Sequence, residues 1–271
     1  MRRVAAPMLS ANLRLGIGLT ILLIVALAVL TVAQIPQRRA VLIASVRAAA
    51  QLSIVALALR GVFAAPLAVI VVLLVMFSVA TWTAARRLAG HRNALRSVAL
   101  ACFAGSGIAI GIIVGLPTLS RDVRTLVAVS GIVLGGTMTA ATLTGRRITA
   151  GLQARQAEVE AWLSIGATSR QAVRDIAREA VFEALVPVLD QTRTVGLVTL
   201  PGAFVGALLG GASTAQAARF QIVVLVGLLC AQSITAVVLA YLLGAPATLP
   251  GATPTAGRVR GWRGRPAGRS G

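Results

Sequence analysis

Seven long apolar runs constrain the fold of this chain more than any other feature of its sequence. A helix rises about 1.5 Å per residue and the hydrocarbon core of a bilayer is about 30 Å thick, so roughly 20 apolar residues are needed to cross it. Segments of about this length are Leu15–Ala33, Ala40–Leu59, Val62–Ala85, Val98–Leu116, Leu126–Leu143, Val195–Ala212 and Ile222–Leu243. We therefore predict an all-α integral membrane protein, a bundle of about seven transmembrane helices.

The composition agrees with a membrane protein and excludes one kind of enzyme. Hydrophobic residues make up 57% of the 271 positions, more than soluble domains usually contain. The net charge of +19 would suit a nucleic-acid partner, but aromatic residues are few and the arginines stand between the apolar runs. All 26 basic residues are arginine. Because P-loop ATPases need a lysine at the nucleotide phosphates, we predict no ATP hydrolysis by that route. The arginine distribution leads us to predict no nucleic-acid partner either.

The cysteines and the histidine do not suggest a cofactor site. Cys102 and Cys230 lie in apolar runs, where a free cysteine usually behaves as a small hydrophobe. The single histidine, His91, stands in an arginine-rich loop. A fixed zinc site therefore lacks ligands, and we expect no cofactor bound by this chain.

The arginine distribution predicts how the chain is oriented. Loops rich in arginine stay in the cytoplasm. If the segment from Arg146 to Arg193 is inside, 18 arginines lie inside and 7 outside. This predicts a multi-pass protein of the inner (plasma) membrane with its amino terminus outside, although Arg2, Arg3 and Arg14 favour the reverse for the first helix. Residues 1–244 form the predicted permease domain, and residues 245–271 a disordered, basic cytoplasmic tail.

The segment of residues 146–193 is the part of the chain suited to water. It holds six of the seven acidic residues. Val159, Trp162, Leu163 and Gly166 follow the spacing that lines up one face of a helix. Beyond the glycine, the pattern suggests a break followed by a second helix.

The second helix is predicted from its capping residues. Thr168 and Gln171 have the spacing of a capping box, so a helix should start there. Pro187 should end it, because the residue before a proline resists helical angles. The segment is then an elbow of two short helices. It either docks into a groove on a partner, rests on lipid or is purely structural, and the capped break, the mixed charge and Trp162 favour docking.

Several stretches resemble a known transporter family. Glu160-Ala161-Trp162, followed by three residues and then Gly166, resembles the EAA-type loop of ABC-transporter permeases. The wider pattern resembles the Fet-type family of iron-export ABC permeases over about residues 42–243. It consists of EVEAWLSIGATSRQAV, ALVPVLDQTRTVGLVTLPGAFVGALLGGAS and ARFQIVV, with SVRAAAQLSIVALALR and GIVLGGTMTAATL earlier in the chain.

The resemblance implies a transporter subunit, not an enzyme. The chain would export a metal ion such as iron, as a homodimer driven by separate ATPase subunits that use ATP and Mg. The implied ATPase-docking residues are Glu158, Glu160, Trp162, Leu163, Gly166, Ala167 and Thr168. Apolar residues at Ala203, Phe204, Val205 and Ala207 stand where the family carries polar and thioether groups, so an organic or other non-metal substrate stays open. A membrane-embedded lipid-modifying enzyme is the second alternative.

Polar residues within the spans are candidates for a translocation pathway, because they usually face a bundle interior or a cavity. They are Arg47, Gln51, Thr137, Met138, Thr139, Asp190 and Thr199. In the alternative interpretation, the threonines bond their own helix backbone and Asp190 caps the sixth span. Glycines at four-residue spacing predict close helix packing: Gly131, Gly135, Gly202, Gly206 and Gly210.

Overall fold

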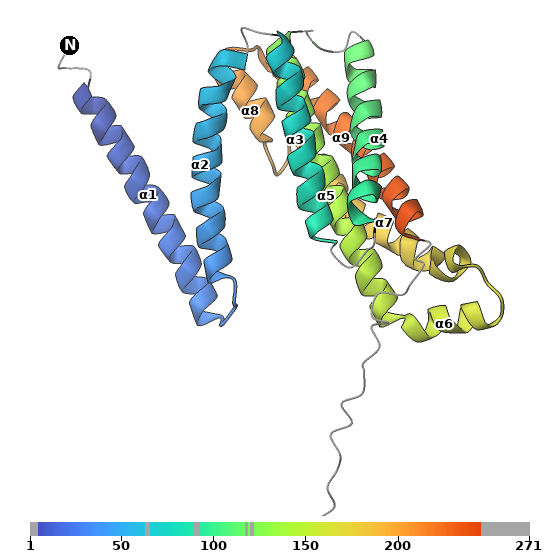
Figure 1. The fold of residues 1–271 in the computed structure, drawn as a ribbon. Helices are drawn as coiled ribbons and strands as arrows, with labels where there is room; N and C mark the ends of the chain where they lie inside the picture. Colours follow the sequence, from blue (N-terminus) through green and yellow to red (C-terminus); the bar gives the residue numbers. More distant parts are fainter. Residues whose placement is uncertain (1–4, 63–65, 89–92, 117–118, 120–121, 245–271) are drawn as a thin grey trace, which may run out of the picture. The chain divides into compact units, whose positions relative to one another are not determined.

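The computed structural model describes residues 5–62, 66–88, 93–116, 119 and 122–244 (Figure 1). Throughout this part of the chain the elements are helices. Six of the described helices are long and apolar enough to cross a membrane. The predicted all-α integral membrane protein is therefore confirmed, with six such helices where the hydropathy of the sequence suggested seven. The predicted disordered tail and His91 lie outside the described residues.

The chain divides into two compact units, Met1–Ala68 and Val69–Gly271. The first unit contains α1 (Ala5–Val32) and α2 (Arg38–Val62), two apolar helices joined by a short turn. Gln34 turns the chain there with a φ of +54°, a left-handed backbone conformation that residues other than glycine seldom adopt. The described side chains of this hairpin are largely exposed.

The second unit is built around three packed helices, α4 (Ala94–Gly115), α5 (Val123–Ala154) and α9 (Thr214–Leu243), with α3 (Pro66–Arg86) beside them. Small residues permit the close approach. A β-carbon on Gly105 of α4 would lie 2.4 Å from the carbonyl oxygen of Ala231 on α9. One on Gly136 of α5 would lie 2.5 Å from a methyl group of Leu228. Helix backbones in a membrane approach this closely only where side chains are small.

Helices α5 and α9 run in the same direction. Near their starts, Thr125 and Gln216 line one cavity. Near their ends, Leu152 and Leu243 belong to one buried apolar cluster. Because the chain leaves α5 at one end of the bundle and enters α9 at the other, the intervening segment must cross the bundle.

That crossing is made by α7 (Ser169–Thr194), a helix of 26 residues or about 39 Å. Val173 packs in the cluster that contains Leu152 and Leu243. Val188, about four turns later, packs with Val129 and Val224 in a second cluster. The prediction that Pro187 ends this helix is wrong: the helix continues for seven residues because Ala184 and Val188 are packed on both sides of the proline, whose own position is exposed.

The sixth apolar run, residues 195–212, is not a transmembrane helix. Its helical part is α8 (Gly202–Leu209), about 12 Å long and without a buried residue. Gly196 and Gly211 turn the chain before and after it, with φ values of +80° and +92°. Pro201 and the glycines favour turns here. A helix as short as α8 cannot cross a bilayer core of about 30 Å.

Candidate functional site

The candidate site is an elbow, defined as α6 (Gln156–Ser164) and the turn 165–168 that leads into α7. Figure 1 shows α6 projecting beside the end of α5. Val159 is 1% exposed and anchors α6 to the apolar cluster at that end. Trp162 and Ile165 are 48% and 76% exposed. Of the predicted apolar face only Val159 is buried, and Trp162, Leu163 and Gly166 lie open.

The turn of the elbow has well-defined hydrogen bonds on both sides. Gly166 adopts a φ of +90°, its N–H donates to the carbonyl of Leu163, and the Ala167 N–H donates to that of Trp162. These are the bonds of a Schellman motif, which glycine favours at this position. The next helix then begins with the predicted capping box, which is confirmed. The N–H of Gln171 donates to Thr168 Oγ1 at 3.4 Å, and the N–H of Thr168 donates to Gln171 Oε1 at 2.8 Å.

The surface of the elbow is apolar and acidic. Glu158 and Glu160 are exposed, and residues 156–169 include no basic residue. Glu158 stands in the first turn of α6, where the helix dipole favours a negative charge. Glu160 accepts a hydrogen bond from Gln156 Nε2 at 2.8 Å. The elbow can therefore complement a groove that is apolar at its centre and basic at its edge.

Two ion pairs attach α7 to α5 just beyond the elbow. Arg147 Nε lies 2.6 Å from Glu183 Oε2, and Arg155 contacts Glu179. The paired residues line a cavity of about 230 Å³ between the two helices. Our sequence analysis missed these pairs. The signal was present, since Glu179 and Glu183 are one turn apart and Arg147 and Arg155 two turns apart. Which helices bring these charges together depends on tertiary packing.

The predicted pathway threonines of α5 form hydrogen bonds with the backbone of their own helix. Thr137 is buried and donates to the carbonyl of Leu134, and Thr139 donates to that of Gly135. The alternative that these threonines bond their own backbone is confirmed. Met138 is partly buried and packs against the apolar cluster that contains Leu152.

The remaining pathway candidates lie on other elements. Arg47 and Gln51 are exposed on α2, in the first unit, one turn apart. Asp190 lies in the last turn of α7, with Oδ1 at 3.9 Å from Arg193. The prediction that it caps a sixth span is wrong, because the N-cap position of α8 is Pro201. Thr199 lies in the turn before α8 and not in a helix, and its N–H donates to the carbonyl of Thr194.

Glycine packing occurs at other positions than predicted. A β-carbon on Gly135, Gly202 or Gly206 would meet no atom within 4 Å, and one on Gly210 would meet only carbonyls of its own helix. Gly131, near Met76, makes a helix contact as predicted. The tightest sites are elsewhere, at Gly105, Gly136, Gly145, Gly151 and Gly227. The predicted glycine packing is thus wrong within this chain for Gly202, Gly206 and Gly210. The reason is that residues 195–212 do not form a transmembrane helix.

The described part of the chain contains no group of three or more His, Cys, Asp or Glu residues arranged to hold a metal ion. Cys102 and Cys230 are free thiols, the first buried and the second partly buried.

Comparisons with known proteins identify relatives over most of the chain. The model of a family described as "Uncharacterised protein family (UPF0014)" matches residues 13–246. The rice UPF0014 membrane protein STAR2 is 33% identical over 203 residues, 74% of this chain and 71% of the rice protein. Protein ALUMINUM SENSITIVE 3 of Arabidopsis thaliana is 34% identical over 71% of each chain. The probable iron export permease protein FetB of Escherichia coli is 30% identical over 72% of this chain and 76% of its own length. No solved structure matches.

Proposed function

This chain belongs to the UPF0014 family of membrane proteins, and from that membership and the elbow we propose that it is the membrane-spanning permease subunit of an ABC exporter. A separate ATPase chain docks on the elbow and supplies the energy. Two copies of this chain work with two ATPase chains, which bind ATP and Mg. The elbow faces the cytoplasm, in agreement with the arginine distribution.

The observation that carries the proposal is the elbow itself. It leaves Trp162, Leu163 and Ile165 uncovered by the rest of the chain, on a turn held by Gly166 and the Thr168 capping box. A helix that rests on lipid usually carries basic residues on its polar face, whereas α6 carries Glu158 and Glu160 and no basic residue. Exposed aromatic and aliphatic side chains on a rigid turn are suited to a groove on another protein.

The attachment of the elbow explains how docking would move the bundle. Val159 anchors α6 in the core, and the ion pairs of Arg147 and Arg155 attach α7 to α5. A displacement of the elbow is therefore passed to α7, which crosses the whole bundle. Nucleotide binding drives transport only if the ATPase holds the elbow differently in its two states, because a partner that binds both equally shifts no equilibrium.

Co-purification tests the docking. The tagged chain is co-expressed with the P-loop ATPase encoded nearest to its gene, and the ATPase retained per permease is measured. We expect Trp162→Ala together with Ile165→Ala to reduce retention about tenfold or more, since buried aromatic anchors usually dominate an interface. The matched control is Leu197→Ala together with Leu209→Ala, which alters exposed residues at the other end of the bundle. Equal retention by both variants would show that the elbow is not the docking site.

The substrate proposed is a metal ion such as iron, and its support is the similarity to FetB. Cells that lack this chain and its ATPase should accumulate the exported metal, as measured by elemental analysis. The wild-type chain should restore the normal content, and the Trp162 and Ile165 double variant should not. If metal contents are unchanged while an organic compound accumulates, the chain exports a non-metal substrate.

A further inference from the structure

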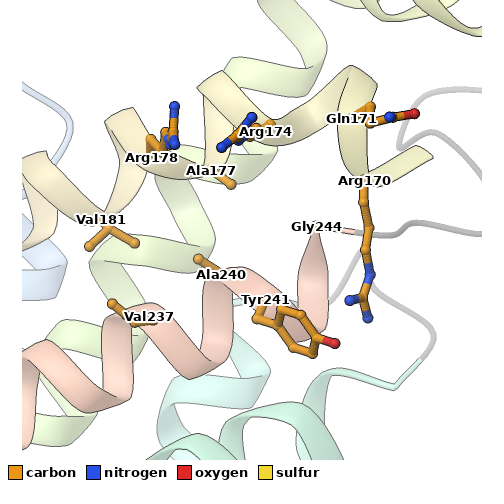
Figure 2. Close-up of a pocket in the computed structure, with 10 residues that line it drawn as sticks. All are labelled: Arg170, Gln171, Arg174, Ala177, Arg178, Val181, Val237, Ala240, Tyr241 and Gly244. Atoms are coloured by element: carbon orange, nitrogen blue, oxygen red, sulfur yellow. The ribbon is translucent and has the colours of Figure 1, made fainter. Parts of the chain in front are cut away.

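A groove lies between the first half of α7 and the end of α9, on the opposite side of α7 from the ion pairs with α5. Its volume is about 520 Å³, within the range of small-molecule sites. Figure 2 shows that α7 contributes a row of polar side chains and α9 contributes Val237, Ala240 and Tyr241. The residues of α9, together with Ala177 and Val181 of α7, make the floor of the groove apolar. Its polar edge on α7 includes Arg170, Arg174 and Arg178.

The arginines of the groove carry an excess of positive charge. They follow one another at four-residue spacing, an arrangement in which like charges destabilise a helix. All seven carboxylate side chains of the sequence lie in the described part of the chain. Of these, Asp175 alone forms an ion pair with the row, at 3.9 Å from Arg178. The two acids further along α7, Glu179 and Glu183, contact Arg155 and Arg147 on the α5 side. The groove therefore favours an anion.

The groove is also placed where water meets the hydrocarbon core. Tyr241 lies in the last turn of α9, an apolar helix that ends at Leu243. The guanidinium carbon of Arg170 lies 3.8 Å from the centroid of the Tyr241 ring, a cation–π contact that orients the charge. Tyrosine and arginine at the end of an apolar helix are typical of the interfacial region of a bilayer. Positive charge at the rim and apolar surface below it match the two parts of a phospholipid.

We propose that this groove binds one anionic phospholipid, in the leaflet next to the elbow. Arg170 and Arg174 bind the phosphate, and an acyl chain lies along Val181, Val237 and Ala240. Basic pockets between transmembrane helices recognise acidic headgroups in this way. The chain's own tail is a poor occupant, because the charged side chains after Gly244 are all arginines. Since Arg170 follows directly on the elbow turn, an occupied groove would brace α7 against α9 at the base of the elbow.

Native mass spectrometry of the purified full-length chain tests the proposal. The protein is delipidated in detergent and titrated with dioleoyl phosphatidylglycerol, with dioleoyl phosphatidylcholine and with glycerol 1-phosphate. We expect one tightly retained phosphatidylglycerol per chain, and weaker binding of the other two. Arg170→Gln together with Arg174→Gln should weaken phosphatidylglycerol binding about tenfold or more, since each removes a charge-assisted hydrogen bond. Ala177→Phe, which fills the floor, should weaken it with all arginines kept.

The matched control removes the same charge elsewhere. Arg146→Gln together with Arg193→Gln alters two exposed arginines outside the groove and should leave lipid binding unchanged, and size-exclusion chromatography confirms folding of every variant. Phosphatidylcholine bound as tightly as phosphatidylglycerol would overturn the proposal, as would glycerol 1-phosphate that competes equally. If the groove variants keep their lipid but lose the ATPase, or lose self-association, the groove is a protein interface and the lipid assignment is wrong.

Discussion

Helix α7 and the run of residues 195–212 have opposite character in sequence and in structure. Helix α7 carries eight charged residues, yet six of its residues are buried and it crosses the bundle. The later run has no charge, yet α8 within it buries none of its residues. Apolar composition shows that a segment tolerates lipid. Which segment crosses the bundle depends on which one can be packed against α5 and α9.

The charges of α7 are arranged so that crossing is possible. They lie mainly in its first three turns and its last turn, and between Glu179 and Asp190 only Glu183 is charged. Glu183 contacts Arg147, which offsets part of the cost of a charge within the bundle. The apolar run lacks any such fit to its neighbours, because glycines and Pro201 divide it into turns and one short helix.

The largest effect is expected at the contact between α4 and α9. A side chain at Gly105 would meet the Thr235 hydroxyl and the Ala231 carbonyl oxygen at 2.1 and 2.4 Å, and a backbone oxygen cannot rotate away. We expect Gly105→Val to lower the free energy of unfolding by about 3 kcal/mol, the upper part of the usual range for overpacking. Unfolding of the reconstituted protein measures the change. A cost below about 1 kcal/mol would contradict the close helix contact.

The packing of α7 against α5 is tested at Ile176. This side chain is buried and rests on Gly151. We expect Ile176→Ala to lower the free energy of unfolding by about 2 kcal/mol, the lower limit for such truncations. In a membrane the unfolded side chain is still surrounded by apolar lipid, so the loss comes mainly from the packing contacts. Leu209→Ala is the control on α8, at a position that is 85% exposed, and should change stability by less than about 0.5 kcal/mol. An equal loss of unfolding free energy at Ile176 and Leu209 would contradict the conclusion that α7 is packed in the bundle and α8 is not.

The ion pair between Arg147 and Glu183 is expected to contribute less. Both side chains are partly exposed, so a double-mutant cycle with Arg147→Gln and Glu183→Gln should give a coupling energy of about 1 kcal/mol or less. The coupling should fall at high salt, because ions screen exposed charges. A coupling energy indistinguishable from zero would mean that α7 is held by apolar packing alone.

The smallest effect is expected on α8 and has the opposite sign. A β-carbon on Gly206 would meet no neighbour, and alanine favours a helix over glycine by about 0.8–1.0 kcal/mol. We therefore expect Gly206→Ala to raise the free energy of unfolding by about 0.5 kcal/mol, with Gly136→Ala as a destabilising counterpart because Leu228 lies 2.5 Å from its β-carbon position. Destabilisation by Gly206→Ala would indicate that α8 packs against a second copy of the chain.

Local patterns in the sequence predicted local structure well. The elbow was predicted from Gly166 and the capping box of Thr168, because caps are formed by residues three positions apart. The role of Pro187 was not predictable in the same way. A proline inside a helix costs about 3 kcal/mol or more, and the burial of residues before and after Pro187 outweighs that cost.

The sequence by itself determined that this is a multi-pass helical membrane protein with a capped, acidic elbow, because apolar length and capping are properties of neighbouring residues. Only the tertiary structure decided that α7 crosses the bundle and that residues 195–212 do not form a span. It also decided that Arg170 contacts Tyr241 of α9 while Glu179 and Glu183 contact α5. Those outcomes depend on contacts between segments far apart in the chain, such as Val188 with Val129 and Val224. Hydropathy alone favours residues 195–212 over α7 as a membrane-crossing segment, and the packing of helices decides in favour of α7.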